Sequence, residues 1–297
     1  MMLFKKIFRK ITSRKWNIGF VQNNFEEIIA GESIKVKWLK HNYKDRWFAD
    51  PFILDVTDDE IITLVEEFYD PINRGRLAKL TIDKKAIELK KDETILELDS
   101  HLSFPSIVRE GNKIYIYPEN YTSGKLIRYE FDPKSAKCIN PVDVCDCPLT
   151  DAIYTNVFGY PQIFSTYAPN PNGRVLGVFE RIGVEKFEKK MDITFPENIA
   201  RNAGAWFEYN GKVYRPAQEC NNGYGHGISL QVVIKNGDNF SFNEVRRMTS
   251  PNSAMNVAFH TFNMYKGMIV VDCQGFRHGK IAAFIDGIRR LFPNLSK

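Results

Sequence analysis

The sequence predicts an all-β protein, a five-bladed β-propeller that carries a short N-terminal amphipathic helical arm. Two observations support this fold class: one unit recurs about every fifty residues, and each unit holds three or four short apolar runs. An isolated blade cannot cover both faces of its own sheet, so the units must pack together. The 297 residues, 43% of them apolar, are therefore expected to form the arm, residues 1–15, and a single propeller domain, residues 16–297.

Each unit opens with a phrase that we expect to form the inner strand of a blade. These phrases are Phe48–Ile53, Leu102–Ile107, Thr150–Thr155, Arg201–Trp206 and Asn256–Thr261. Second strands are expected at Ile61–Tyr69, Lys113–Asn120, Pro161–Tyr167, Lys212–Cys220 and Gly267–Gln274. Third strands begin behind a glycine, at Gly75–Ile82, Gly124–Phe131, Gly173–Ile182, Gly227–Ile234 and Gly279–Ile285.

The blades are expected to cover about residues 45–98, 99–147, 148–195, 196–249 and 250–288. Two further apolar runs, Trp16–Gln22 and Ile34–Leu39, precede the first blade and have the pattern of strands. We expect one of them to supply the outer strand of the last blade, which would close the ring.

Residues 1–15 have apolar side chains at helical spacing with Lys and Arg between them, which is typical of a helix on an anionic membrane surface. The alternative is a helix that packs on the base of the propeller. The sequence shows neither a membrane-spanning stretch nor the continuous apolar core of a signal peptide. We therefore expect a cytoplasmic protein, with peripheral membrane contact through this arm as a further expectation.

Charge and cysteine content exclude two classes of function. The net charge is +5, and no stripe of Lys and Arg runs through the blades, so nucleic acid is not an expected partner. The five cysteines have neither zinc-site nor disulfide-framework spacing. We assign no metal site or cofactor with certainty. A divalent cation held in the axial cavity by Asp50, Glu67, Asp151 and His260 remains an alternative.

Polar side chains gather at one predicted rim of the propeller. In a blade, the start of the first strand and the end of the antiparallel second strand lie at the same rim. Glu66 and Glu67 point to opposite faces of their strand, so at most one lines the pocket, and we assign Glu67 to it. The polar residues assigned to this rim are Asp50, Glu67, Ser103, Glu119, Asn120, Asp151, Arg201, Asn202, Arg215, Gln218, Glu219, His260 and Asp272.

Paired carboxylates are the groups that glycosyl chemistry requires. One acts as base or nucleophile near the anomeric carbon, and another exchanges a proton with the linking oxygen. We therefore expect Asp50 and Asp151 to be catalytic, together with Glu219 or Glu119. The amide, guanidinium and hydroxyl groups around them would hold sugar hydroxyls. The alternative is that the acids are structural ties, such as an Arg–Glu pair that braces a blade.

Several motifs resemble one propeller family, that of the N-terminal domain of plant glucosamine inositolphosphorylceramide transferases and its stand-alone bacterial relatives. The motifs are FADPFI with LVEEFY, HLSFP with IYPEN, TDA, RNAG with YRPAQEC, YG at Tyr224–Gly225, and FHT with VVD. The resemblance covers roughly residues 45–275, and YRPAQ followed by YG is its most specific part. It adds Tyr224 to the substrate-binding candidates. More distantly, the chain resembles five-bladed glycosidases of the arabinanase, levansucrase and invertase type.

The distant resemblance implies roles for individual acids. Asp50 matches the base or nucleophile of the glycosidases, and Asp151 matches the acid that orients substrate or tunes the proton donor. Glu219 matches the general acid by blade order, but it lies on a second strand. Because the inner strand of blade four carries Arg201 and Asn202 instead, Glu119 is the competing general acid.

The expected function is therefore that of a carbohydrate-active enzyme that acts at a glycosidic linkage, most simply a glycosyltransferase of cell-surface glycan or glycolipid assembly. A glycan would be the substrate, with a nucleotide sugar donor and a lipid-linked acceptor as further expectations. No GxGxxG or DxD motif is present, so donor phosphates would have to meet Arg201, Arg215 or Arg277. The alternatives are a glycoside hydrolase and a non-catalytic glycan-binding propeller.

Overall fold

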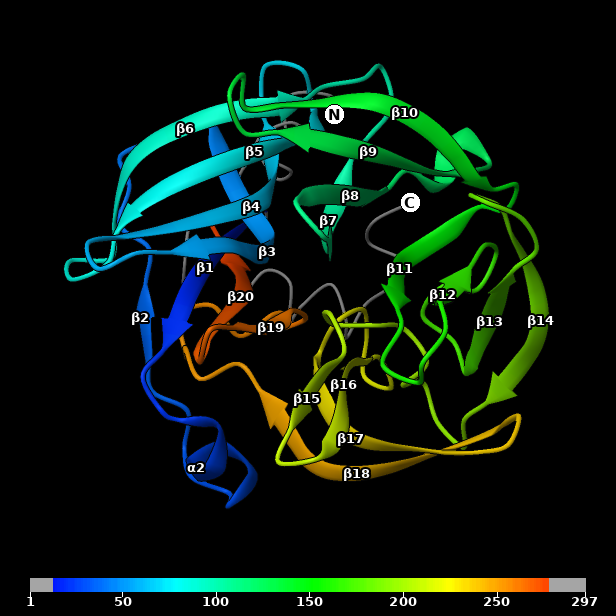
Figure 1. Ribbon diagram of the computed structural model, residues 1–297. Coiled ribbons are helices and arrows are strands. Elements are labelled where there is room, and N and C mark those ends of the chain that lie inside the picture. Colours follow the sequence, from blue (N-terminus) through cyan, green and yellow to red (C-terminus); the bar gives the residue numbers. More distant parts are fainter. Residues whose placement is uncertain (1–12, 278–297) are drawn as a thin grey trace, which may run out of the picture.

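The computed structural model describes residues 13–277 and contains five four-stranded antiparallel sheets arranged around one axis (Figure 1). The predicted five-bladed propeller is thus confirmed. Blades one and two consist of β3 (Arg46–Val56), β4 (Glu60–Tyr69), β5 (Arg74–Asp83), β6 (Glu88–Leu96), β7 (Ser103–Glu110), β8 (Lys113–Glu119), β9 (Leu126–Asp132) and β10 (Lys137–Cys145). Blades three and four consist of β11 (Leu149–Thr155), β12 (Gln162–Tyr167), β13 (Val175–Arg181), β14 (Phe187–Thr194), β15 (Phe207–Tyr209), β16 (Lys212–Glu219), β17 (Gly227–Asn236) and β18 (Asn239–Thr249).

Blade five is assembled from both ends of the chain, in the order β19 (Phe262–Tyr265), β20 (Met268–Phe276), β1 (Arg14–Val21) and β2 (Val36–Trp38). In Figure 1 the blue β1 lies beside the orange-red β20. As expected, an N-terminal run supplies the outer strand, which is β2. The other run, β1, takes the third position, where we expected the run 279–285. That run lies outside the described residues.

Of the predicted arm, residues 1–15, the structure describes only the last three residues. Residues 1–12 lie outside the described part of the chain, and Arg14 and Lys15 open β1 instead of belonging to a helix. Between β1 and β2 lies a single helical turn and a half, α2 (Phe25–Ile29), which a capping box between Asn24 and Glu27 starts. No helix within residues 13–277 is long and apolar enough to cross a membrane.

Three inner strands contain a bulge at the same place. Asp50, Phe104 and Asp151 adopt left-handed φ values of 50°, 44° and 48°, and the pairing register shifts beside each. Such a bulge re-aims the side chain and the amide of its residue. The three positions therefore point backbone N–H groups and two carboxylates toward the axis.

The inner phrases of blades four and five are less regular than predicted. Each contributes only an isolated bridge, Asn202 with Ala217 and Ala258 with Gln274, before the short strands β15 and β19 begin. Side chains bind backbone groups in or next to these phrases. Arg215 donates to the carbonyls of Ile199 and Ala200, just ahead of the first phrase, and Asp272 accepts from two amides of the second.

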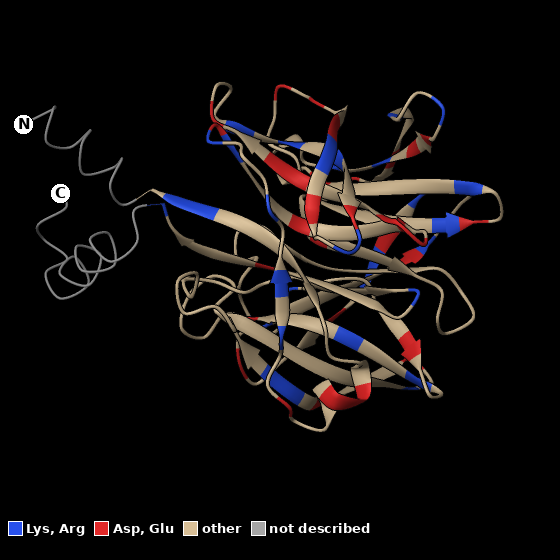
Figure 2. Cartoon of the chain, turned by 90° about the vertical axis from the view of Figure 1, so that its left-hand side faces the viewer, with Lys and Arg blue, Asp and Glu red and all other residues tan. Residues whose placement is uncertain are grey.

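Apolar residues fill the space between neighbouring blades. Phe52 packs edge-on against Phe104 with ring centroids 4.9 Å apart, and Phe164 contacts Trp206 at 4.2 Å. Basic and acidic residues are interspersed along the strands and loops of the described chain (Figure 2). The blades thus form a rigid frame around a polar axis.

Candidate active site at the propeller axis

A series of carboxylates links successive blades around the axis. Asp272 of blade five accepts the N–H of Asp50 in blade one at 3.0 Å, and Asp50 accepts the N–H of Phe104 in blade two at 3.1 Å. Glu119 of blade two accepts the N–H of Asp151 in blade three at 2.9 Å. The accepted amides belong to the three bulge residues with left-handed φ, so the inner-strand bulges bring the acids together.

Asp50, His260 and Asp272 form one half of the axial cluster. His260 Nδ1 lies 3.0 Å from Asp272, and its Nε2 lies 3.7 Å from Asp50 Oδ1. Burial would lower the pKa of His260, but Asp272 and Asp50 raise it to about 9. Burial raises the pKa of Asp50 to about 7 against the attraction of His260. Asp272 is also buried, yet the imidazolium holds its pKa below the ordinary value.

Glu119, Asp151 and Arg201 form the other half. Arg201 Nε lies 2.6 Å from Asp151 Oδ2, and Arg201 Nη2 lies 3.1 Å from Glu119 Oε2. The Gln218 amide also donates to Asp151 Oδ2, at 2.6 Å. Burial raises the pKa of Glu119 well above its ordinary value; Arg201 opposes this rise, and the charge of Asp151 adds to it. Burial therefore favours the protonated form of Glu119.

Tyr224 lies over both halves. Its ring centroid is 5.3 Å from that of His260 and 5.2 Å from the guanidinium carbon of Arg201. The side chain as a whole is 44% exposed. Burial around the hydroxyl raises its pKa well above the ordinary value, and the charges of Asp50 and Asp151 add to this rise. Tyr224 thus joins solvent to the buried acids.

Glu66, not Glu67, faces the axial cluster. The charge of Glu66 contributes to the raised pKa of Asp50, and its Oε1 lies 3.2 Å from His101 Nε2. Glu67 binds Arg46 at 2.7 Å and Arg76 at 2.6 Å, one guanidinium on each oxygen. The assignment of Glu67 to the pocket is therefore corrected, because both of its oxygens are engaged in ion pairs.

Two other predicted binding residues, Arg215 and Asn202, hold backbone segments of blades three and four in place. Arg215 is fully buried and donates to Asn202 Oδ1, to Gln231 Oε1 and to the carbonyls of Ile199 and Ala200. Burial lowers its pKa to about 9. Asn202 itself donates to the carbonyl oxygens of Asp151 and Phe164. Since the polar groups of Arg215 and Asn202 bond to the protein itself, their predicted contact with substrate is corrected.

Glu219 lies at the end of β16 in a separate contact pair. Its Oε2 is 2.8 Å from His226 Nδ1, and its Oε1 accepts the N–H of Asn221 at 2.8 Å. No hydrogen bond or ion pair among residues 13–277 joins Glu219 to the axial acids. Ser103 is buried at the start of β7 and lies opposite Glu119 in the strand pair. Asn120 is buried directly after Glu119, where β8 ends.

One group of axial residues has metal-ligand geometry. A ligand atom from each of Asp50, His260 and Asp272 lies within 4.8 Å of the other two. The His260 ring already contacts Asp272 through Nδ1 and lies near Asp50 through Nε2, so the charges of the three residues compensate one another. Glu67, expected among the ligands, lies in its own ion pairs. We therefore infer that Asp50, His260 and Asp272 use their charges to bind one another.

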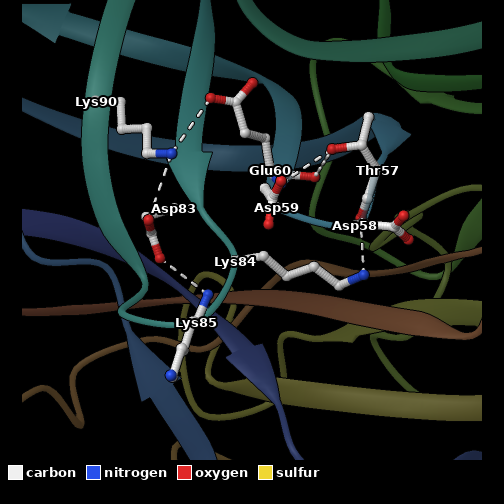
Figure 3. A pocket seen from close by; sticks show the side chains of 8 residues that line it. All are labelled: Thr57, Asp58, Asp59, Glu60, Asp83, Lys84, Lys85 and Lys90. Carbon is white, nitrogen blue, oxygen red and sulfur yellow. Dashed lines mark hydrogen bonds and ion pairs between the residues drawn. The ribbon is translucent and has the colours of Figure 1, made fainter.

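A large cavity lies away from the axis, at the turns of blade one (Figure 3). Its lining includes Lys90, which pairs with Glu60 at 3.3 Å and with Asp83 at 3.4 Å. The turns that line the cavity join β3 to β4 and β5 to β6, and they lie at the rim opposite Asp50. Lys90, Glu60 and Asp83 are thus paired with one another, and the cavity lies away from the candidate site.

The fold and the axial acids define a five-bladed propeller with a carboxylate-rich axis. Solved structures of glycoside hydrolases have the same fold. A GH43 β-xylosidase/α-arabinofuranosidase from a compost microbial metagenome is 11% identical with a TM-score of 0.55, covering 80% of this chain and 92% of that one. A GH43_1 enzyme from Xanthomonas citri complexed with xylotriose is 11% identical with a TM-score of 0.55, covering 79% and 88%. At such identity the likeness concerns the fold alone.

The chain belongs to the family described as glucosamine inositolphosphorylceramide transferase 1, N-terminal, whose model matches residues 29–288. Similar curated proteins carry the same transferase name. The one from Oryza sativa subsp. indica is 24% identical over 211 residues, which is 64% of this chain and 26% of the relative. The one from Arabidopsis thaliana is 28% identical over 203 residues, which is 63% and 25%. The match thus spans about a quarter of each relative. The suspected family is confirmed.

Proposed function

We propose that this chain is a carbohydrate-active enzyme that acts at a glycosidic linkage during glycan or glycolipid assembly. The observation that carries the proposal is the division of the axial acids by environment. The pKa values of Asp50 and Glu119 are raised, whereas that of Asp272 is lowered. Titratable groups whose environments separate their pKa values are the usual basis of acid–base assignment in an active site.

In this proposal Glu119 is the proton donor. Its contacts with the Asp151 amide and with Arg201 both use Oε2, so Oε1 can carry the proton. Glu119 would give this proton to the linking oxygen as the bond to the anomeric carbon breaks. Asp50 would act on the other side, as nucleophile toward that carbon or as base toward the acceptor hydroxyl.

Three further residues would support these acids. Asp151, paired with Arg201, would hold sugar hydroxyls and keep the proton on Glu119 through its charge. Tyr224 would bind the sugar ring at the solvent side of the cluster, because aromatic faces and hydroxyls both suit sugars. Glu219 is not used in this assignment, since its two oxygens bind His226 and Asn221.

Transfer to a lipid-linked acceptor is the finer part of the proposal. It is supported by the names of the family and of its curated relatives, because those names include a glycosylated ceramide lipid, glucosamine inositolphosphorylceramide. The direct test combines the purified chain with UDP-N-acetylglucosamine and vesicles that contain inositolphosphorylceramide, and measures labelled product by mass spectrometry. We expect product with the unmodified chain and at least a ~100-fold lower rate with Asp50→Asn, the range for loss of one acid–base group. Equal rates would contradict the catalytic role.

A non-catalytic glycan-binding propeller is the second candidate. The observation that favours it is that Asp50, Glu119 and Asp151 each accept hydrogen bonds from the frame. If this function holds, Asp50→Asn leaves the affinity for oligosaccharides nearly unchanged, and neither transfer nor hydrolysis of p-nitrophenyl glycosides is detected. Hydrolysis without transfer would instead identify the chain as a glycosidase.

We also propose a cytoplasmic location with peripheral membrane contact through residues 1–12 of the predicted arm, because their basic amphipathic pattern suits an anionic surface. Sedimentation with vesicles of phosphatidylcholine and phosphatidylserine tests this contact. The full chain should pellet with the vesicles, and a chain that lacks residues 1–12 should not. Equal pelleting of the two chains would contradict the proposal.

A further inference from the structure

A second cavity of about 540 Å³ lies between blades five and one, beside the axial cluster. Its volume falls within the range of ~300–1,000 Å³ that is typical of small-molecule sites. No acidic residue is among the residues 13–277 that line it. The lining carries four cations and several aromatic rings, and the most important of these are Lys15, Lys44, Arg46, Arg277, Trp16 and Tyr43.

The cavity opens at the same rim as the axial acids. Arg46 opens β3, four residues before Asp50, and Arg277 directly follows β20, the strand that carries Asp272. Trp16 lines the cavity and stacks on His260 with ring centroids 4.0 Å apart. A single indole ring thus separates the cavity from the acid cluster.

The positive charge of the cavity is only partly neutralised. Arg46 pairs with Asp45, Glu67 and Asp92, and Arg277 pairs with Asp70. Within residues 13–277, no ion pair engages Lys15 or Lys44. Cations that line a concave surface without counter-charges attract anions, and phosphate groups most strongly.

The aromatic residues add flat surfaces to this charge. Tyr43 is 40% exposed, and the Arg46 guanidinium lies 4.3 Å from its ring centroid. Two lining residues also hold buried polar atoms without a partner in the described chain, Asn17 Oδ1 and His41 Nδ1. Burial, together with Lys15 and Arg46, lowers the pKa of His41, so the ring is neutral and adds no charge. Aromatic rings beside cations suit a ligand that combines a planar base with phosphate.

We propose that this cavity binds the nucleoside diphosphate part of a sugar donor and directs the sugar past Trp16 toward Asp50. The identification of the ligand as a donor rests on the proposed function. Of the three arginines expected to meet donor phosphates, Arg201 and Arg215 are engaged with axial acids and with the frame of blade four. Arg277 lines the cavity and remains at its rim.

The test measures binding of UDP to the full chain by calorimetry and by quenching of tryptophan fluorescence. The test variant is Lys15→Glu/Lys44→Glu, which reverses the two cations that lack an ion pair. The matched control is a double variant with the same change in charge, Lys37→Glu/Lys212→Glu, at two exposed lysines outside the cavity lining. We expect the test variant to bind UDP at least ~10-fold more weakly, the effect of one charge-assisted hydrogen bond or more. The control should bind like the unmodified chain.

Three outcomes would overturn the proposal: no binding of UDP, equal affinity in the test and control variants, or pyrophosphate binding as tightly as UDP. Vesicles with phosphatidylinositol phosphates provide the other source of phosphate. If they bind through Lys15 and Lys44 and UDP does not, the cavity is a lipid-headgroup site and the donor assignment is wrong. Because Asp50→Asn should bind UDP normally while losing turnover, failure of this inference and failure of the proposed function give different results.

Discussion

At the scale of single residues, the partner of each axial acid decides what it can do. Asp272 accepts bonds from three backbone amides and contacts His260, so it is fixed as an anion. Within the described chain, Glu119 and Asp50 each accept only one backbone amide, and burial raises their pKa values. The same residue type thus has different chemistry at neighbouring positions of one axis.

Arg201 should contribute strongly to stability. Its side chain is 9% exposed and neutralises Asp151 and Glu119. Arg201→Met leaves two buried acids without their cation, and we expect the free energy of unfolding to fall by about 3–5 kcal/mol. Urea unfolding at pH 7 measures this fall, with Arg201→Lys as the milder control. A loss below about 1 kcal/mol would contradict the ion-pair assignment.

His260 should make the stability depend on pH. Its pKa is raised from 6.5 to about 9 in the folded chain, so the stabilisation is complete below pH 6.5 and is lost as the pH rises to about 9. Across this window we expect the free energy of unfolding to fall by on the order of 3 kcal/mol. The pKa of Asp50 is raised from 3.8 to about 7, so Asp50 adds a fall in the free energy of unfolding as the pH rises from 3.8 to about 7.

Urea unfolding at several pH values measures this dependence. The double variant His260→Gln/Asp50→Asn should remove most of the slope between pH 6.5 and 9, because both groups that titrate in that window are then absent. A slope that is equally steep in the variant would show that another group carries it.

At the scale of elements, the loop between β16 and β17 holds Tyr224 in place. Gly225 has a φ of +54°, and a Cβ there would lie 2.6 Å from His260 Cβ. Gly124 has a φ of +76° with open space around it. Both changes to Ala strain the backbone, but only Gly225→Ala also creates a clash.

We expect Gly225→Ala to destabilise the chain by about 1–3 kcal/mol more than Gly124→Ala, the usual cost of overpacking. Thermal unfolding followed by circular dichroism compares the two variants. In the proposed enzyme, Gly225→Ala should also lower activity because it displaces Tyr224 from His260. Equal melting temperatures would contradict the tight contact.

Most strands could be predicted because apolar runs and turn residues repeat in each blade. The predicted inner phrases of blades one to three coincide with β3, β7 and β11. The irregular phrases of blades four and five could not be predicted, because Arg215 and Asp272 bind the backbone in or next to these phrases through contacts distant in sequence. The rim position of Asp50, Glu119 and Asp151 followed from the strand register.

The sequence pattern does not show which groups an individual side chain contacts. Period-two alternation shows that Glu66 and Glu67 face opposite sides, but it does not show which side is the axis. Arg46 and Arg76 determine that Glu67 is the paired one. The sequence pattern also predicts substrate contacts for Asn202 and Gln218, but Asn202 bonds to blade-three carbonyls and Gln218 bonds to Asp151. Local sequence does not contain these contacts between blades.

At the scale of the whole molecule, β1 closes the ring by pairing with β20 along Arg14–Phe20. Its side chains Ile18 and Phe20 are buried between blades five and one. A chain that starts at residue 13 keeps β1, whereas one that starts at residue 23 exposes the edge of β20. We expect the first to show a cooperative thermal transition and the second to aggregate or remain unfolded. Size-exclusion chromatography and circular dichroism distinguish them, and two equally folded chains would contradict the role of β1.

The most direct test of the axial acid–base assignment compares Glu119→Gln with Glu219→Gln. Both changes replace a buried carboxyl by an amide of the same shape, and only Glu119 lies in the axial cluster. The measurement is the rate of glycosyl transfer or hydrolysis by each variant under conditions where both are folded. The assignment predicts a loss of at least ~100-fold for Glu119→Gln and a loss of less than ~10-fold for Glu219→Gln. The reverse order, or unchanged rates in both variants, would contradict it.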